Sequence, residues 1–309
     1  MFNKFKASLP GFDINHLLKS LKDSLTEPST EDLEPRDKPS CELVQVRDGK
    51  LPAVFIINGF LSENSECSKD WLEVVDELYP DNKVIRVDWK AGNLTEMMFD
   101  KGIVPSFQTG GASTAGFAAM LAARSTLLGI VGSVGASTVN KVMGHWKSAF
   151  YETRHVAFSL SVCLEQNPDF DQCILMGHSL GGRIVRHTLS ELKTDNLVSV
   201  AYVFAGAVSS NDDQWQSILD KHSELKLINC LSMKDSVLKS VYKVGTVGDH
   251  APAGLAPVMD EHTNTLNLDV TEFASGHMDF KQSELGKYLK SEFSQLDKGK
   301  QQQLFLASQ

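Results

Sequence analysis

The stretch that decides the fold is CILMGHSLGGRIVRHTL, residues 173–189, in which Ser179 stands between two glycines. The pattern Gly-x-Ser-x-Gly arises by chance in about one chain in ten of this length. The motif alone therefore decides little, and its context has to show whether Ser179 is a nucleophile. Here the apolar run before the serine is typical of a strand, and the apolar spacing after it is typical of a helix.

A serine at a sharp turn between a strand and a helix meets the first requirement for nucleophilic catalysis. The turn lifts the serine oxygen above the sheet, and small flanking residues, here Gly177, Gly181 and Gly182, permit the strained backbone. The hydroxyl also needs a base, a group that orients the base, and N–H donors for the oxyanion. The backbone N–H of Leu180 is expected to be one of these donors.

Strands and helices alternate on both sides of this stretch. An edge strand is expected at 41–49, and further strands at 51–59, 83–89, 172–178, 197–206, 225–232 and 265–270. Helices are expected at 69–79, 180–193, 212–222, 234–243 and about 278–291. This alternation predicts an α/β fold with a mostly parallel sheet and helices on both of its faces.

The partners of the serine should follow it in the order acid, then histidine. Asp235 follows the strand at 225–232, and His277 follows the strand at 265–270. Ligands bind at the carboxyl edge of an open α/β sheet, where both loops are expected to lie. The sequence therefore predicts Ser179, Asp235 and His277 as a catalytic triad.

Other assignments of the acid and the base stay open. His250 precedes the last expected strand and is the second choice for the base, and Asp212 and Asp213 are the alternative acids. His178 is expected to be structural, because a side chain next to the serine on a sharp turn points away from it. The remaining histidines are interpreted as surface or packing residues: His145, His155, His187, His222 and His262.

A second oxyanion donor should come from the loop after an early central strand. In FIINGFLSE, residues 55–63, Asn58 and Gly59 turn the chain, and the N–H of Phe60 is the candidate, with Leu61 next. Gly59 allows a close approach of the backbone. The alternative is an ordinary turn at the end of a strand.

The composition limits the classes of partner. The net charge of −9, without a cluster of Lys and Arg, argues against nucleic-acid binding and gives no attraction to anionic lipid. The five cysteines are odd in number, widely spaced and without C-x-x-C, which argues against a disulfide framework or a zinc site. No secretory signal is recognised at the start, so we expect a cytoplasmic protein.

Three parts are expected along the chain. Within residues 1–40, the apolar spacing predicts an amphipathic helix at 13–25, and the proline and charged residues of 26–40 are typical of a linker. Residues 41–291 form the main domain, and 292–309 are a polar tail. A helical insertion at about 97–150 separates two strands by more than a crossover needs.

The segment 114–139 within this insertion is rich in small residues and carries a single charge. Its length would suffice for a membrane span, but the strands on both sides belong to one sheet. We therefore predict a buried or lid-like helical insertion. Peripheral contact of 114–139, or of 13–25, with a membrane or a partner stays open.

Several of these motifs resemble a known superfamily. INGF (57–60), GHSLGG (177–182) and the Ser–Asp–His order resemble the α/β-hydrolases over about residues 41–291. The C-terminal motifs are similar to hydrolases typified by the transmembrane and coiled-coil domain proteins: NCLSMKDSVL, PAGLAPV, LNLDV and GHMDF. The resemblance implies an α/β-hydrolase fold, Asp235 and His277 as triad members, and hydrolysis of esters or lipids. This chain departs from the membrane-bound members because it lacks a span rich in Leu, Ile and Phe.

Together these features predict a serine hydrolase that cleaves a carboxylic ester, with a lipid-like or acyl substrate, and needs no metal or organic cofactor. The apolar insertion is the reason to expect a hydrophobic small molecule. Two alternatives stay open: a non-catalytic binding or membrane-associated scaffold with the same fold, and the same triad acting on thioesters or peptides. The oligomeric state is not determined by the sequence.

Overall fold

The computed structural model describes residues 36–60, 62, 68–92, 136–239, 251–260 and 262–293. Within these ranges a seven-stranded sheet has the order β1-β3-β2-β4-β5-β6-β7. The strands are β1 (Cys41–Arg47), β2 (Lys50–Ile57), β3 (Asn82–Trp89), β4 (Cys173–His178), β5 (Val198–Phe204), β6 (Lys226–Leu231) and β7 (Thr265–Asp269). β1 lies at the edge and runs antiparallel to β3, and every other neighbouring pair is parallel.

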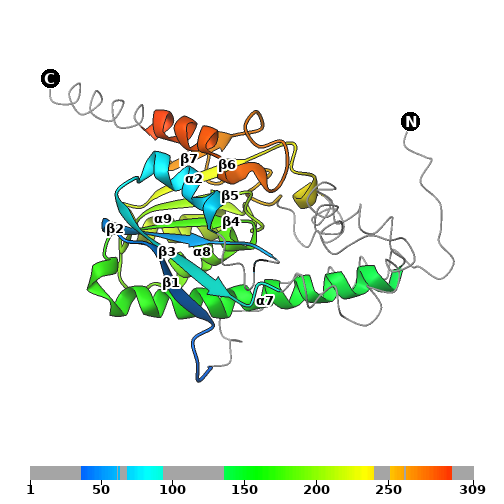
Figure 1. Cartoon of the computed structure of the whole chain (residues 1–309), viewed down its shortest axis with the longest axis horizontal. Helices are drawn as coiled ribbons and strands as arrows, with labels where there is room; N and C mark the ends of the chain where they lie inside the picture. Colours follow the sequence, from blue (N-terminus) through cyan, green and yellow to red (C-terminus); the bar gives the residue numbers. More distant parts are fainter. Residues whose placement is uncertain are drawn as a thin grey trace.

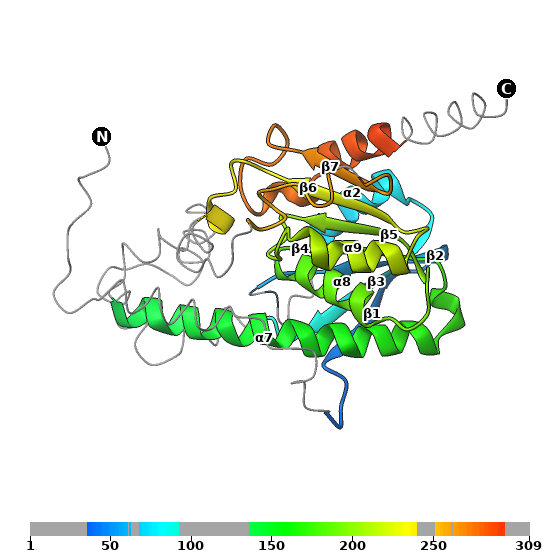
Figure 2. The same cartoon turned by 180° about the vertical axis from the view of Figure 1, so that it is seen from behind.

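Helices cover both faces of this sheet. The longer helices are α2 (Lys69–Leu78), α7 (Ala136–Gln166), α8 (Leu180–Glu191) and α9 (Asp212–Lys221). There are also two short 3-10 helices, η2 (Pro168–Phe170) and η3 (Asp279–Lys281), and helical residues at 236–239 and 283–293. Figures 1 and 2 show α7, α8 and α9 on one face, and α2 with the helix 283–293 on the other.

The central strands are buried because helices cover them on both sides. All five residues from Ala53 to Ile57 in β2 are fully buried, as are Leu175 and Met176 in β4. Such unbroken apolar runs are typical of parallel strands. Each fully buried large aliphatic side chain contributes roughly 1.5–3 kcal/mol of transfer free energy, and the sheet core is therefore the main source of stability.

The fold prediction is confirmed. The sheet is mostly parallel with helices on both faces, its edge strand lies where the sequence placed it, and the arrangement is that of an α/β-hydrolase. The helices expected at 180–193 and 212–222 correspond to α8 and α9. In the expected helix 234–243, residues 236–239 are helical, and the part from 240 onward lies outside the described residues.

The region before β4 is only partly described. Residues 97–135 of the expected insertion lie outside the described residues, as do 1–35 and 294–309. α7 is described over Ala136–Gln166, so it extends well past residue 150, where the insertion was expected to end. α7 packs mainly on α8, and Val156, Leu160 and Leu164 in its second half are fully buried.

In the described ranges, none of the helices combines the length and the apolar character that a bilayer span requires.

The topology brings distant parts of the sequence to one edge. Asn58 follows β2, Ser179 follows β4, Asp235 follows β6 and His277 follows β7. These four strands are parallel within one sheet, so the four residues start from the same carboxyl edge.

Candidate active site

Ser179 occupies the turn between β4 and α8 in a strained backbone conformation. Its φ of 58° and ψ of −118° are unfavourable for a residue with a side chain. Backbone hydrogen bonds fix this turn: the Ser179 N–H donates to the Phe204 carbonyl, and the Ser179 carbonyl accepts from Gly182 and Ala207, each at 3.0 Å. The serine is therefore held in place, with 8% of its surface exposed.

The glycines around the serine are required by close backbone contacts. A Cβ atom on Gly177 would lie 2.3 Å from the Gly181 carbonyl oxygen, and one on Gly181 would lie 2.1 Å from the Ile57 carbonyl oxygen. No side chain fits at either position. This packing of β4, α8 and β2 explains why both glycines of the motif are present.

Ser179, His277 and Asp235 form a hydrogen-bonded chain. His277 Nε2 lies 2.9 Å from Ser179 Oγ, and His277 Nδ1 lies 2.6 Å from Asp235 Oδ2. A carboxylate can only accept, so Nδ1–H donates to Asp235, and Nε2 of the neutral ring accepts from the serine hydroxyl. Asp235 is fully buried, and its Oδ1 accepts from the Leu238 N–H at 2.9 Å.

The loops that carry the acid and the base are tied to each other. Ser232 Oγ donates to the Ala274 carbonyl at 2.7 Å, and the Met233 N–H donates to Thr271 Oγ1 at 2.8 Å. These bonds join the loop after β6 to the loop after β7. The distance between the carboxylate and the imidazole of His277 is thereby set by the backbone on both sides.

His178 is structural, as expected, but its side chain holds the loop of His277. Its Nε2 donates to the His277 carbonyl at 2.6 Å, and the two rings are 4.9 Å apart. Burial, together with His277 and Lys281 nearby, lowers the pKa of His178 well below its ordinary value of 6.5. His178 is therefore neutral near pH 7.

This burial predicts a loss of stability in acid. The unfolded chain binds a proton at His178 near pH 6.5 and the folded chain does not, so stability falls as the pH drops below that value. Between about pH 7 and pH 5.5, the free energy of unfolding should therefore fall by about 1 kcal/mol less in His178→Gln than in the wild type. Urea unfolding of both proteins at the two pH values measures this, and equal losses would contradict it.

The two residues expected to supply the oxyanion donors, Leu180 and Phe60, directly follow Ser179 and Gly59 in the chain. The N–H of Leu180 is among the first amides of α8, which a helix leaves without an internal partner. Gly59 packs directly on Ser179: a Cβ there would lie 2.6 Å from Ser179 Cβ and 3.2 Å from Oγ. Phe60 follows in a turn in which Ser62 Oγ donates to the Gly59 carbonyl at 2.7 Å. Phe60 is the residue after Gly59, and its role as an oxyanion donor stays a prediction.

The alternative residues are distributed differently. His250 and Leu61 lie outside the described residues, as does the side chain of Asp212. Asp213 is exposed at the start of α9. His222 is fully buried, and its Nε2 bonds to the Leu189 carbonyl. His187 is also buried, whereas the others are half-buried: His145, His155 and His262.

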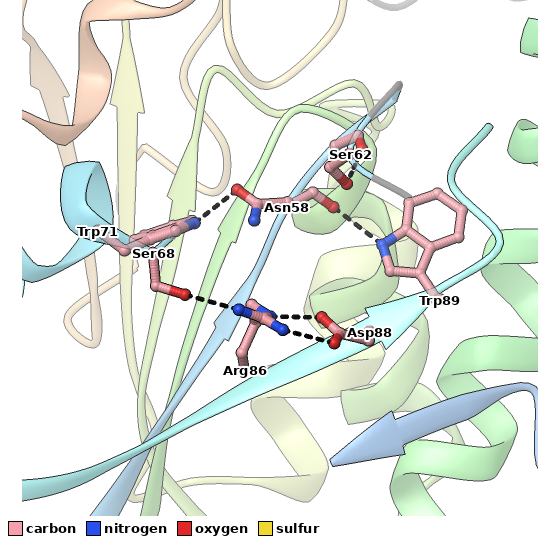
Figure 3. Close-up of polar contacts among 8 residues, drawn as sticks. Asn58, Ser62, Ser68, Trp71, Arg86, Asp88 and Trp89 are labelled. Carbon is pink, nitrogen blue, oxygen red and sulfur yellow. Dashed lines mark hydrogen bonds and ion pairs between the residues drawn. The ribbon is translucent and has the colours of Figure 1, made fainter. Parts of the chain in front are cut away.

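The side chains around Asn58 are not recognisable as a group from the sequence. Trp71, Trp89 and Lys281 contact it from three separate elements, and Figure 3 shows the two tryptophans. A tryptophan at the last position of a strand next to the predicted oxyanion loop was the one available signal. It was too weak to use without the strand order.

In the described ranges, neither the cysteines nor any cluster of metal-ligating residues indicates a second functional site. There, Cys41, Cys163, Cys173 and Cys230 are free. The same ranges contain no group of three His, Cys, Asp or Glu residues that could hold a metal ion.

Solved structures similar to this chain include hydrolases and esterases. Mouse alpha/beta hydrolase domain-containing protein 10 shares 14% identity over 86% of this chain and 97% of its own, with a TM-score of 0.39. Est1E from Butyrivibrio proteoclasticus, solved with ferulic acid, shares 12% identity over 82% and 93%, with a TM-score of 0.41. The esterase domain of a Rhodothermus marinus protein shares 12% identity over 81% and 96%, with a TM-score of 0.38.

One protein family matches most of the chain. Residues 54–292 match the family described as "Protein of unknown function (DUF726)". This range contains the serine turn, both loops after β6 and β7, and the Asn58 loop. The resemblance to the hydrolases typified by the transmembrane and coiled-coil domain proteins is confirmed at this level. The chain therefore belongs to the DUF726 family.

Proposed function

We propose that this protein is a serine hydrolase that cleaves carboxylic esters through an acyl-enzyme. The observation that carries the proposal is the hydrogen-bonded chain from Ser179 through His277 to Asp235, built on a strained turn between strand and helix. This geometry matches what a serine needs in order to become a nucleophile.

The proposed reaction uses the triad atoms in turn. Ser179 Oγ attacks the ester carbonyl while His277 Nε2 takes its proton. Asp235 stabilises the imidazolium that forms, and the N–H groups of Phe60 and Leu180 bind the oxyanion. His277 then gives the proton to the leaving alcohol, which leaves the acyl group on Ser179. Water, activated by His277, releases the acid and restores the serine.

A scaffold without catalysis fits the arrangement less well. A residue in strained backbone geometry costs about 1–3 kcal/mol, and a carboxylate such as Asp235 is costly to bury unless it is paired. A binding module gains nothing from either feature. Both are useful when Ser179 has to present its oxygen to a base that is held in one orientation.

We further propose that the ester substrate is an acyl or lipid-like one. Met233 and Met278 are large apolar side chains with about half or more of their surface exposed, and they flank Asp235 and His277 in the sequence. These two exposed apolar side chains, close in sequence to the acid and the base, support a substrate with an apolar part. The segment 114–139, which motivates a hydrophobic substrate from the sequence, has its side chains outside the described residues.

A fluorophosphonate probe tests the chemistry directly. We expect one label per chain, mapped to Ser179 by mass spectrometry of peptides. The proposal fails if the protein stays unlabelled or is labelled at another residue. p-Nitrophenyl esters of graded length test the substrate class, since each methylene that is buried should raise kcat/KM by about fourfold. A flat profile with labelled Ser179 would overturn the acyl preference alone.

A further inference from the structure

Two buried tryptophans donate hydrogen bonds to Asn58. Trp71 Nε1, from α2, lies 2.7 Å from Asn58 Oδ1, and Trp89 Nε1, at the end of β3, lies 3.0 Å from the Asn58 carbonyl oxygen. Figure 3 shows both indoles pointing at this residue from opposite sides. The side chain and the backbone of Asn58 are thus fixed separately, directly before Gly59 and Phe60.

A buried lysine, Lys281, contacts the side-chain oxygen of Asn58 from the segment that follows His277. Lys281 Nζ lies 3.3 Å from Asn58 Oδ1, is paired with Asp70, and sits 5.3 Å from the centre of a Trp71 ring. Lys281 belongs to η3, which begins two residues after His277. Asn58 is therefore linked to the same short segment that carries the base.

Arg86 ties together the two elements that carry the tryptophans. Its guanidinium binds both carboxylate oxygens of Asp88, at 2.5 and 2.8 Å, and donates to Ser68 Oγ at 3.1 Å (Figure 3). Ser68 precedes the first turn of α2, and Asp88 precedes Trp89. Arg86 is 7% exposed, so this link lies within the protein.

The position of this network gives it a consequence for the proposed reaction. An oxyanion donor works only within about 2.7–3.1 Å of the developing charge, whereas a loop at the end of a strand is usually among the more mobile parts of a fold. Gly59 already packs on Ser179. The contacts that fix Asn58 therefore also restrict Gly59 and the N–H of Phe60, two residues further on, relative to the serine.

We propose that Trp71, Trp89 and Lys281, together the Asn58 clamp, are positioning residues that hold the Phe60 N–H on the oxyanion. The inference rests on the proposed function, because it assigns a task in the same reaction. The clamp residues act through Asn58 and do not themselves touch the reacting atoms. Arg86 supports the clamp by joining the elements that carry its two tryptophans.

The test compares two clamp variants with a matched control. Trp89→Phe removes the indole N–H and keeps an aromatic ring, and Asn58→Ala removes the acceptor for Trp71 and Lys281. The control is Trp215→Phe, since the fully buried Trp215 also donates from Nε1 to a backbone carbonyl, that of Ser209, at 2.9 Å. Titration with a fluorophosphonate counts the active sites, and kcat for a p-nitrophenyl ester is divided by that number.

The clamp predicts a loss in the chemical step alone. Both clamp variants should lower kcat per labelled site by about tenfold or more, with KM within about twofold. The Ki of a trifluoromethyl ketone, which forms an oxyanion on the serine, should rise by a similar factor. Trp215→Phe should change none of these values per labelled site.

Each other outcome identifies what fails. If the variants have fewer labelled sites but unchanged kcat per site, the tryptophans only support folding and the clamp is refuted. An equal loss in Trp215→Phe refutes it as well. If Trp89→Phe does not fold, Asn58→Ala decides, because Asn58 is only half-buried. A wild type that is neither labelled nor active refutes the proposed function itself.

Discussion

Ser179→Ala is expected to reduce ester turnover by about 10⁶-fold, leaving only the residual rate that the oxyanion donors and substrate binding support. The variant removes the oxygen that forms the acyl bond in the proposed reaction. His277 then has no hydroxyl group to deprotonate. The methyl group fits the same space and leaves the backbone hydrogen bonds of the turn untouched. Turnover of p-nitrophenyl butyrate by purified wild type and variant measures the loss.

The matched control is a buried serine far from the turn. Ser161 lies in α7, is 3% exposed, and donates from Oγ to the Phe158 carbonyl. Ser161→Ala should therefore keep its turnover, whereas Ser179→Ala should lose it at an unchanged melting temperature. Activity that survives in Ser179→Ala would show that another group forms the covalent bond, or that contaminating esterase accounts for the turnover.

Much of the fold could be predicted because its signals are local. The apolar run before Ser179 and the apolar spacing after it are both visible within residues 173–189. In a parallel sheet the carboxyl ends of the strands meet at one edge, so a residue's position after a strand places it near the other strand ends. That rule, together with the order serine, acid, histidine, favoured Asp235 and His277 over the alternatives, and the structure brings both together with Ser179.

The residues around the triad could not be predicted because their contacts depend on the strand order. Trp89 reaches Asn58 because β3 lies beside β2, although 31 positions separate the two residues in the sequence. His178 bonds to the backbone of His277, 99 positions away, and no side-chain pattern announces a contact with a carbonyl. α7 continues to Gln166 because its second half packs against α8, which is a tertiary cause.

These supporting contacts share one physical role. The turn of Ser179, the loop of His277 and the loop of Asn58 are each held by hydrogen bonds from groups outside the triad. Donors and bases that are fixed before the substrate arrives need no reorganisation in the transition state, which is where most of the rate enhancement of such sites originates. The position of the oriented base should therefore matter nearly as much as its presence.

Asp235→Asn tests this orientation and is expected to lower kcat by about 10⁴-fold, the size known for loss of the correct histidine tautomer. The Leu238 N–H donates to Oδ1 of Asp235, so the carbonyl oxygen of an asparagine would stay at that position. Its NH₂ group would then face Nδ1 of His277 and donate to it. The ring proton would move to Nε2, opposite the serine hydroxyl, and the base could no longer accept.

The comparison is with Asp213→Asn, the same exchange at the exposed acid that was the alternative candidate. Its kcat should match that of the wild type, while Asp235→Asn should retain its fold, since asparagine is nearly the same size as aspartate. The fluorophosphonate should still reach Ser179 in Asp235→Asn but react far more slowly, because the probe also needs a deprotonated serine. A kcat within tenfold of the wild type would show that His277 takes its tautomer from another neighbour, and that the carboxylate at 235 supports folding rather than the base.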